Sequence, residues 1–225
     1  MSKLFKKYLI PLAVLPALTA AVLLIADTKH TALISVVFAL LACVPFFLSF
    51  EKGQSSTKRL TAVAVMTALS VAGRLIFAAV PAFKPVTAIV VITAVYLGAQ
   101  AGFMTGALSA VISNLYFGQG PWTPFQMLSW GLIGFVAGLM GAQLKKSRIL
   151  LAVYGVLAGA AFSLVMDVWT VVWYDESFTP ALMGAALLSS LPFTALYAGS
   201  NALFLLVLEK PVGKKLDRLI TKYGM

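Results

Sequence analysis

Long runs of uncharged, mostly apolar residues dominate the chain, and short clusters of charge separate most of them. A helix needs about 20 apolar residues, within a range of about 17 to 25, to cross a hydrocarbon layer about 30 Å thick. Measured against that length, the candidate spans are Tyr8–Ala26, Thr31–Phe50, Leu60–Val80, Val86–Leu97, Gly102–Tyr116, Phe125–Leu144, Ile149–Trp173 and Ala181–Leu208. The pattern predicts an all-α integral membrane protein.

Glycines shape the middle of the chain, where residues 85–144 contain no Lys, Arg, Asp or Glu. The sequence Gly98-Ala-Gln-Ala-Gly102 predicts the bend between the fourth and fifth spans, because glycine adopts backbone angles that other residues avoid. Further glycines recur at spacings that let two helix backbones approach closely. These are Gly131, Gly134, Gly138 and Gly141 in the sixth span, and Gly155 and Gly159 in the seventh. They predict helix packing, not a phosphate-binding loop.

The composition excludes several classes of protein. Of the 225 residues, 61% are hydrophobic and only 11% are charged, whereas a soluble domain carries about 25% charged residues. So few charged residues cannot provide the polar surface that a water-soluble protein needs. This excludes an ordinary cytosolic enzyme, a nucleic-acid-binding domain and a disordered protein. The lone cysteine, Cys43, lies in an apolar run and is interpreted as a buried or lipid-facing hydrophobe, so thiols supply neither a disulfide framework nor a metal cluster.

The positive charge, formally +10, is distributed unevenly. Cytoplasmic loops of membrane proteins collect Lys and Arg. With the N-terminus inside, the basic residues on the cytoplasmic side are Lys3, Lys6, Lys7, Lys52, Lys58, Arg59, Lys145, Lys146, Arg148, Lys210, Lys214, Lys215, Arg218 and Lys222. Only Lys29 and Lys84 fall in outer loops. We therefore expect a multi-pass membrane protein with both termini cytoplasmic, whose basic residues meet anionic membrane lipid and not nucleic acid.

The first span also needs to be distinguished from a removable signal peptide, because three lysines precede it. Residues 26–30 lack a convincing small-residue cleavage site, and Pro11 and Pro16 interrupt the run. A retained membrane helix is the preferred interpretation.

Two ionisable residues, Arg74 and Asp167, fall inside predicted spans, where an unpaired charge is unfavourable. Their positions place both in the outer half of the membrane. They either form an ion pair that joins two helices or line a ligand cavity, and the two roles are compatible.

Aromatic and amide residues gather in the outer connections, which hold all four tryptophans. An interfacial belt would have aromatic residues at both faces, so the asymmetry favours an outward-facing pocket. The candidate substrate-binding residues are Arg74, Phe83, Lys84, Asn114, Tyr116, Gln119, Trp122, Trp130, Asp167, Trp169, Trp173 and Tyr174. No catalytic or metal-ligating set is predicted, because the only histidine, His30, lies in an outer loop and no P-loop motif is present.

Three stretches are characteristic: residues 59–74 (RLTAVAVMTALSVAGR), residues 117–126 (FGQGPWTPFQ), and Leu191-Pro-Phe193 leading to Asn201-Ala-Leu-Phe204. From about Arg59 to Pro211 the chain resembles the S components, the membrane-embedded substrate-binding subunits, of energy-coupling factor (ECF) vitamin transporters. Within that family it looks closest to the cobalamin-type S components. An S component for another vitamin, such as riboflavin or a queuosine precursor, is the alternative.

The resemblance implies a six-helix substrate-binding core at residues 59–211, preceded by an N-terminal membrane hairpin at 1–58 and followed by a basic cytoplasmic tail at 212–225. It also implies that the protein lies in the cell membrane of a prokaryote, together with a transmembrane scaffold subunit and two cytoplasmic ATPases, which consume ATP. The S component of such a transporter has no cofactor of its own and topples in the membrane to release its vitamin. The family's Ala-x-x-x-Ala scaffold-docking signature is matched by Ala64 and Ala68, with Ala72 continuing the row.

Thr194 and Tyr197 stand where an acidic residue and a histidine are expected in related chains. Two other classes of function remain open. A self-sufficient secondary transporter normally has two similar halves, and no convincing internal repeat is found. A membrane enzyme would use Asp167 as acid or base, although that carboxylate has no evident catalytic partner.

Overall fold

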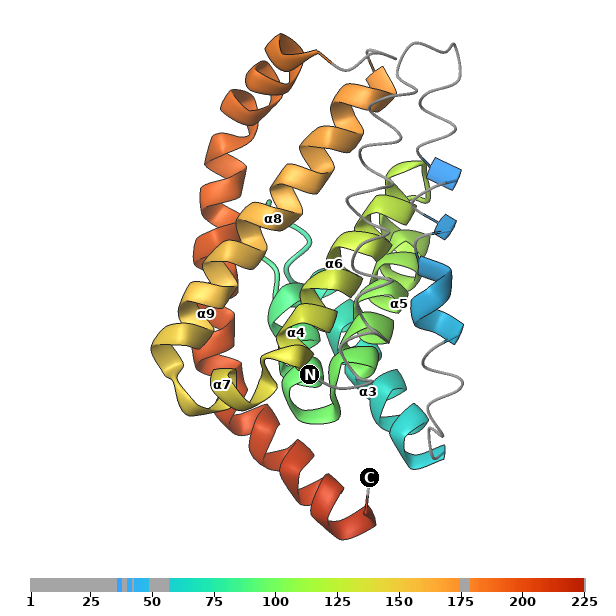
Figure 1. Ribbon diagram of the computed structural model, residues 1–225, viewed down its shortest axis with the longest axis vertical. Coiled ribbons are helices and arrows are strands. Elements are labelled where there is room, and N and C mark those ends of the chain that lie inside the picture. Colours follow the sequence, from blue (N-terminus) through green and yellow to red (C-terminus); the bar gives the residue numbers. More distant parts are fainter. Residues whose placement is uncertain (1–35, 38–39, 42, 49–56, 175–178, 225) are drawn as a thin grey trace, which may run out of the picture.

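The computed structural model describes residues 36–37, 40–41, 43–48, 57–174 and 179–224, and within them all regular structure is helical. The predicted span Tyr8–Ala26 lies outside these residues, and Thr31–Phe50 is described only in part. The complete helices are α3 (Thr57–Ile76), α4 (Val86–Leu97), α5 (Ala99–Phe117), α6 (Trp122–Leu139), α7 (Gly141–Lys146), α8 (Arg148–Tyr174) and α9 (Pro180–Tyr223) (Figure 1).

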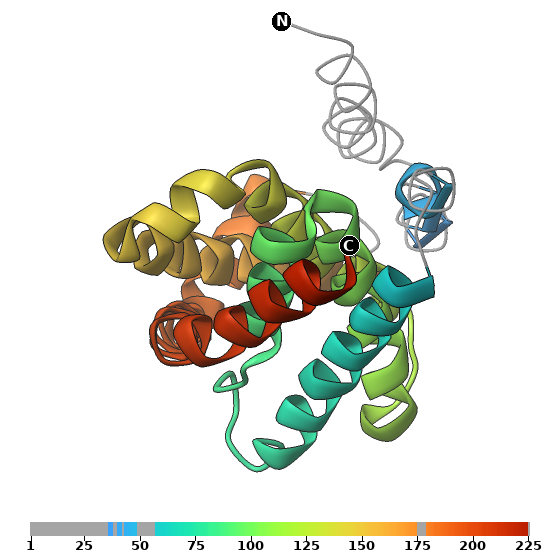
Figure 2. The same ribbon diagram turned by 90° about the horizontal axis from the view of Figure 1, so that it is seen from below.

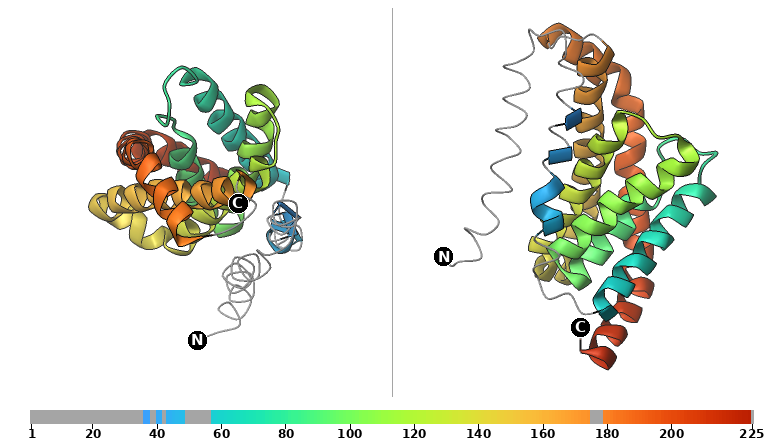
Figure 3. Two further views of the ribbon diagram at one scale, coloured as in Figure 1. Left: turned by 90° about the horizontal axis from the view of Figure 1, so that it is seen from above. Right: turned by 90° about the vertical axis from the view of Figure 1, so that its right-hand side faces the viewer.

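Three of the described helices, α3, α8 and α9, are long and apolar enough to cross a membrane. Helix α8 has 27 residues, which corresponds to about 40 Å and exceeds the hydrocarbon thickness. Figure 3 (right) shows α8 and α9 rising together beyond the upper ends of α5 and α6. The predicted all-α architecture is therefore confirmed for the described residues, and these three helices are consistent with a membrane protein.

Helix α4 occupies the centre of the bundle. It has the predicted bounds and is only 12 residues long, and all of them except Tyr96 are buried. Helices α3, α5, α6 and α9 pack around it (Figure 1). A helix that is apolar on every side is most stable when neighbours cover it completely. This helix, about 18 Å long, is consequently a core element and not an independent span.

Helices α5 and α6 pack with their backbones in close contact. A methyl group at Gly102 would lie 2.8 Å from the carbonyl oxygen of Gly134, and one at Gly131 would lie 2.7 Å from the Phe103 ring. The same holds between α8 and α9, where a methyl group at Gly159 would lie 2.6 Å from the Ala198 nitrogen. The predicted packing role of these glycines is confirmed. Gly98, with φ 92°, forms the bend between α4 and α5.

Helix α9 is longer than the sequence pattern predicted. It begins after Thr179, whose hydroxyl accepts a hydrogen bond from the Leu182 amide, and continues to Tyr223 instead of ending near Leu208. The helix includes Pro211 and the basic segment that follows. Hydropathy alone marks where apolar residues stop, whereas the helix continues as an amphipathic segment that buries Gly213 and Leu216.

One end of the bundle collects the start of α3, helix α7 and the last turns of α9, which cross beneath the other helices (Figure 2). Lys145 forms an ion pair with Asp217 at 3.3 Å, and Lys58 Nζ donates to the Tyr223 carbonyl at 3.2 Å. Every described Lys and Arg except Arg74 and Lys84 belongs to these segments or to the first residue of α8. We call this the basic end.

The described part of the second predicted span packs on the outside of α5 and α6. Phe46 stacks on Phe103 with ring centroids 4.1 Å apart and meets Phe135 edge-on at 5.0 Å. Cys43 is buried beside them, which confirms its interpretation as a small apolar side chain.

Candidate functional site

A cavity of about 50 Å³ lies toward the end of the bundle opposite the basic end. It receives side chains from α3, the α3–α4 connection, α4, α6, α8 and α9. Its lining residues are Arg74, Lys84, Val86, Thr87, Gln126, Trp130, Phe162, Tyr197 and Asn201.

Arg74, in the last turn of α3, is held by two neutral acceptors on α5. Its Nη1 donates to the hydroxyl of Ser113 and to Oδ1 of Asn114, the latter at 2.8 Å. The guanidinium carbon also lies 4.6 Å from the centre of the Phe117 ring and 5.1 Å from that of Trp130. Aromatic faces attract cations, so these contacts orient the guanidinium at the cavity.

Asn114 links Arg74 to the first turn of α6. The side chain is 1% exposed, and its amide nitrogen donates to Thr123 Oγ1 and to Gln126 Oε1, both at 2.9 Å. Because Oε1 of Gln126 accepts this bond, the Nε2 amide is the group that Gln126 can offer to a ligand.

Lys84 brings a second positive charge to the cavity from the α3–α4 connection. Its backbone N–H donates to Ser200 Oγ on α9 at 3.1 Å, which fixes the connection against that helix. Its ammonium lies 5.7 Å from the centre of the Phe117 ring, which Arg74 also faces. Burial, and after it the charge of Arg74, lowers the pKa of Lys84 from its ordinary value of 10.5.

Asn201, on α9, presents an unused donor. The residue is 2% exposed, and no described residue accepts a hydrogen bond from its amide nitrogen. Buried polar groups are usually paired, and this donor on the cavity wall is free to bind a ligand acceptor.

The apolar wall of the cavity is aromatic. Trp130 and Phe162 stack with ring centroids 4.9 Å apart and planes 15° from parallel, and Phe162 meets Tyr197 edge-on at 5.1 Å. The cavity lining therefore combines aromatic side chains with hydrogen-bond donors and positive charge.

The predicted site residues do not all meet at the cavity. Arg74, Lys84 and Trp130 line the cavity, and Asn114 positions Arg74. Phe83 lies next to the cavity residue Lys84, and its ring packs against Phe204 at 4.9 Å.

The other predicted aromatic residues form a cluster where α6 begins and α8 ends. Trp122 meets Trp169 at 5.9 Å, Trp169 meets Tyr174 at 6.1 Å, and Trp173 packs against the same core. None of these four residues lines the cavity. Two further candidates, Tyr116 and Gln119, are exposed, and Gln119 Nε2 donates to the Val111 carbonyl at 2.7 Å.

Asp167 and Arg74 bind different partners. Asp167 accepts a 2.7 Å hydrogen bond from the Ser190 hydroxyl, which joins α8 to α9, whereas Arg74 bonds to α5. The direct ion pair that the sequence left open is not formed between them. The reason is geometric, because similar depth along two helices does not bring side chains onto facing surfaces.

Several cavity residues were absent from the sequence-based selection: Thr87, Gln126, Phe162, Tyr197 and Asn201. Asn201 could have been selected by the criterion applied to Arg74, a polar side chain within an apolar span. In the sequence, Tyr197 is notable only because related chains are expected to have a different residue in that region. Nothing in the local sequence distinguishes Phe162 from other apolar residues of α8.

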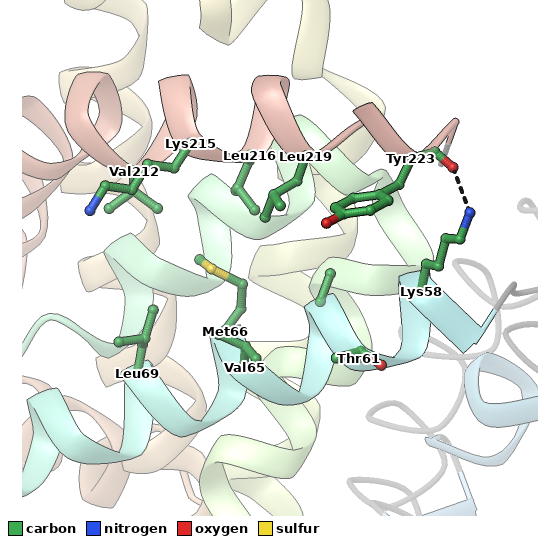
Figure 4. A pocket seen from close by; sticks show the side chains of 11 residues that line it. Lys58, Thr61, Val65, Met66, Leu69, Val212, Lys215, Leu216, Leu219 and Tyr223 are labelled. Atoms are coloured by element: carbon green, nitrogen blue, oxygen red, sulfur yellow. Dashed lines mark hydrogen bonds between the residues drawn. The ribbon is translucent and has the colours of Figure 1, made fainter. Parts of the chain in front are cut away.

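A larger groove, of about 620 Å³, lies at the basic end between α3 and the last turns of α9 (Figure 4). Met66 and Leu69 face Leu216 and Leu219 across it, while Lys58 and Tyr223 close one end. The expected docking residues Ala64, Ala68 and Ala72 are exposed on α3. They adjoin the groove, since helix residues three apart are neighbours and Ala68 and Ala72 follow Val65 and Leu69 at that spacing.

Comparison with known proteins identifies the family to which the chain belongs. The family model for the S component of an ECF-type riboflavin transporter matches residues 54–216. The chain belongs to this family. The resemblance found in the sequence is thereby confirmed at the level of the ECF S component, and the family is one of transport proteins, not of enzymes.

Curated proteins similar to this chain include UPF0397 proteins of Aliivibrio and Vibrio species. A UPF0397 protein of Aliivibrio fischeri (strain MJ11) is 26% identical over 154 residues, covering 60% of this chain and 81% of the relative. One from Aliivibrio salmonicida (strain LFI1238) is 28% identical over 148 residues, covering 64% and 78%. One from Vibrio atlanticus (strain LGP32) is 28% identical over 142 residues, covering 55% and 76%. No solved structure gives a significant match to this S component.

Proposed function

We propose that this S component captures a vitamin in the cavity bounded by Arg74, Lys84 and Trp130, and delivers it through an ECF-type ABC importer. The observation that carries the proposal is the convergence of two cations, an unpaired amide donor and an aromatic wall on one cavity. Binding sites for small molecules combine apolar walls with a few convergent polar groups in this way.

The remainder of the importer supplies the energy. In this proposal a transmembrane scaffold subunit and two cytoplasmic ATPases act on the S component, which topples to release its vitamin inside. ATP is consumed by those ATPases, and the S component itself holds no cofactor.

The orientation of the chain is part of the proposal. With the basic end at the cytoplasmic face, both termini are cytoplasmic and the cavity lies toward the outer face. Residues 59–211 form the six-helix core, with α7 as a short connection, and residues 1–58 add a membrane hairpin. The basic segment that follows residue 211 continues α9 to Tyr223 and lies at the cytoplasmic face. The distribution of described lysines and arginines supports this arrangement.

The scaffold docks, in this proposal, on the exposed row Ala64, Ala68 and Ala72 and on the adjoining groove. Small side chains let another helix approach closely. The groove is lined mainly by apolar side chains of α3 and α9, which gives such a helix an apolar surface to cover.

The ligand that fits best is a compact, planar vitamin. The cavity of about 50 Å³ has room for a few water molecules. A planar ring needs only a modest separation of Trp130 and its neighbours to enter, whereas cobalamin, our first expectation, requires the surrounding helices to part widely. The match to the riboflavin-type family model supports the smaller class.

The direct test is calorimetric titration of the purified chain in lipid nanodiscs with riboflavin, cobalamin and other vitamins in turn. One-to-one binding of a compact planar vitamin, weakened in Trp130→Leu, is expected. Tight cobalamin binding would overturn the size argument, and absence of binding by a folded protein would overturn the capture role. Uptake in reconstituted vesicles should occur only when scaffold and ATPase subunits are present.

A further inference from the structure

The cavity holds two positive charges that no described acidic residue neutralises. Arg74 donates its hydrogen bonds to the neutral acceptors Ser113 and Asn114. Lys84 contacts the Phe117 ring and lies close enough for the charge of Arg74 to affect its protonation. Two cations that face one partly buried site repel each other and lose solvation, so the arrangement is unfavourable until an anion joins it.

The polar groups facing the cavity are biased toward donors. Asn114 Oδ1 already accepts from Arg74, and Gln126 Oε1 already accepts from Asn114. The Nδ2 of Asn201 has no acceptor among the described residues and lies on the cavity wall. Arg and Lys side chains can only donate. A ligand that satisfies these groups must therefore bring acceptor oxygens.

The aromatic wall specifies the rest of the ligand. Trp130 and Phe162, which stack on each other, both line the cavity, and Trp130 also lies beside the guanidinium of Arg74. An aromatic ligand that packs against these side chains would therefore lie close to the two cations.

We propose that the captured vitamin is anionic: a flat aromatic ring bearing a carboxylate or phosphate, whose oxygens are received by Arg74, Lys84 and Asn201. This inference rests on the proposed function and adds the chemical class of its substrate. A carboxylate and a phosphate share the required chemistry, because both accept several charge-assisted hydrogen bonds at once.

The test compares ligand pairs that differ mainly in charge: riboflavin with riboflavin 5′-phosphate, and nicotinamide with nicotinate. We expect the anionic member of at least one pair to bind about 10- to 100-fold more tightly than its neutral partner. That preference should disappear in Lys84→Met and in Arg74→Gln. The phosphate and carboxylate pairs together identify which anion the site selects.

A second measurement needs no vitamin and guards against variants that fail to fold. Lys84→Met removes one of the two unneutralised cations, so the ligand-free variant should have a higher thermal midpoint than the ligand-free wild type. Inorganic phosphate, at ionic strength matched with sodium chloride, should stabilise the wild type more than Lys84→Met. The matched control is Lys210→Met, an exposed lysine at the basic end, which should leave the phosphate effect unchanged.

The outcomes separate the two proposals. Equal or tighter binding of the neutral members, or a preference that survives both cavity variants, overturns the anionic inference and leaves vitamin capture standing. A folded protein that binds no vitamin at all, charged or neutral, overturns capture and this inference together. A phosphate effect that is identical in the wild type and Lys84→Met also contradicts the inference.

Discussion

Asn114 Oδ1 accepts a 2.8 Å hydrogen bond from Nη1 of Arg74, and this contact joins α5 to the last turn of α3 at the cavity. The amide of the same asparagine binds Thr123 and Gln126, so one buried side chain sets the position of both Arg74 and the start of α6.

Asn114→Ala should destabilise the protein and weaken ligand binding. The substitution leaves buried donors and acceptors without partners, which costs about 1–3 kcal/mol and lowers the thermal midpoint by roughly 2–4 °C per kcal/mol. Thermal unfolding and calorimetric titration in nanodiscs measure both effects. Gln143→Ala, an exposed glutamine of α7, is the control and should change neither. An unaltered affinity in Asn114→Ala would show that Arg74 does not depend on this contact.

Asp167→Asn should leave ligand affinity within about twofold of wild type, a difference below about 0.5 kcal/mol. The reason is that Asp167 bonds to Ser190 and not to Arg74, and an asparagine can still accept from that hydroxyl. A double-mutant cycle with Ser190→Ala should reveal coupling in unfolding free energy, because directly contacting residues are not additive. A large loss of affinity would instead place Asp167 in the ligand site.

Trp130 and Trp169 should respond differently to replacement by leucine. Trp130 lines the cavity, so Trp130→Leu should weaken binding of an aromatic ligand by about 0.5–1.5 kcal/mol, or roughly 2- to 12-fold. Trp169 packs in the separate cluster with Trp122, so Trp169→Leu should alter stability but not affinity. Titration of both variants distinguishes one extended aromatic pocket from two distinct clusters.

Ala68→Trp should abolish uptake by the complete importer while leaving vitamin binding by the isolated S component intact. A bulky ring on the exposed alanine row prevents close approach of a scaffold helix but lies away from the cavity lining. Ala160→Trp, on an exposed position of α8, is the matched control. Uptake that persists in Ala68→Trp would exclude the row as the docking surface, and loss of binding as well would indicate misfolding.

Lys84 should make ligand-free stability depend on alkaline pH. Because burial and Arg74 lower its folded pKa below 10.5, the folded state binds fewer protons than the unfolded state between those two values. Stability contributed by this group therefore rises as the pH increases through the folded pKa toward 10.5. The thermal midpoint of the wild type minus that of Lys84→Met should therefore increase over this window. A difference that does not change with pH would show that folding does not lower the pKa of Lys84.

Much of the architecture could be predicted from the sequence because it depends on local patterns. The bounds of α4, the bend at Gly98 and the close packing at Gly134 and Gly159 follow from apolar run length and from residue size. The end of α9 could not be predicted in this way, because its last turns are stabilised by packing of residues such as Leu216 against the bundle.

The sequence by itself determined that this protein is an all-helical membrane protein of the ECF S-component family, with its basic residues concentrated at helix ends. It also singled out Arg74, Lys84 and Trp130. Only the tertiary structure decided that Asn201, Phe162 and Tyr197 join them, that four outer aromatic residues lie in a separate cluster, and that Asp167 bonds to Ser190. The physical reason is that hydrophobicity along a helix fixes its depth in the membrane, whereas the rotation and crossing of the helices decide which side chains at that depth meet.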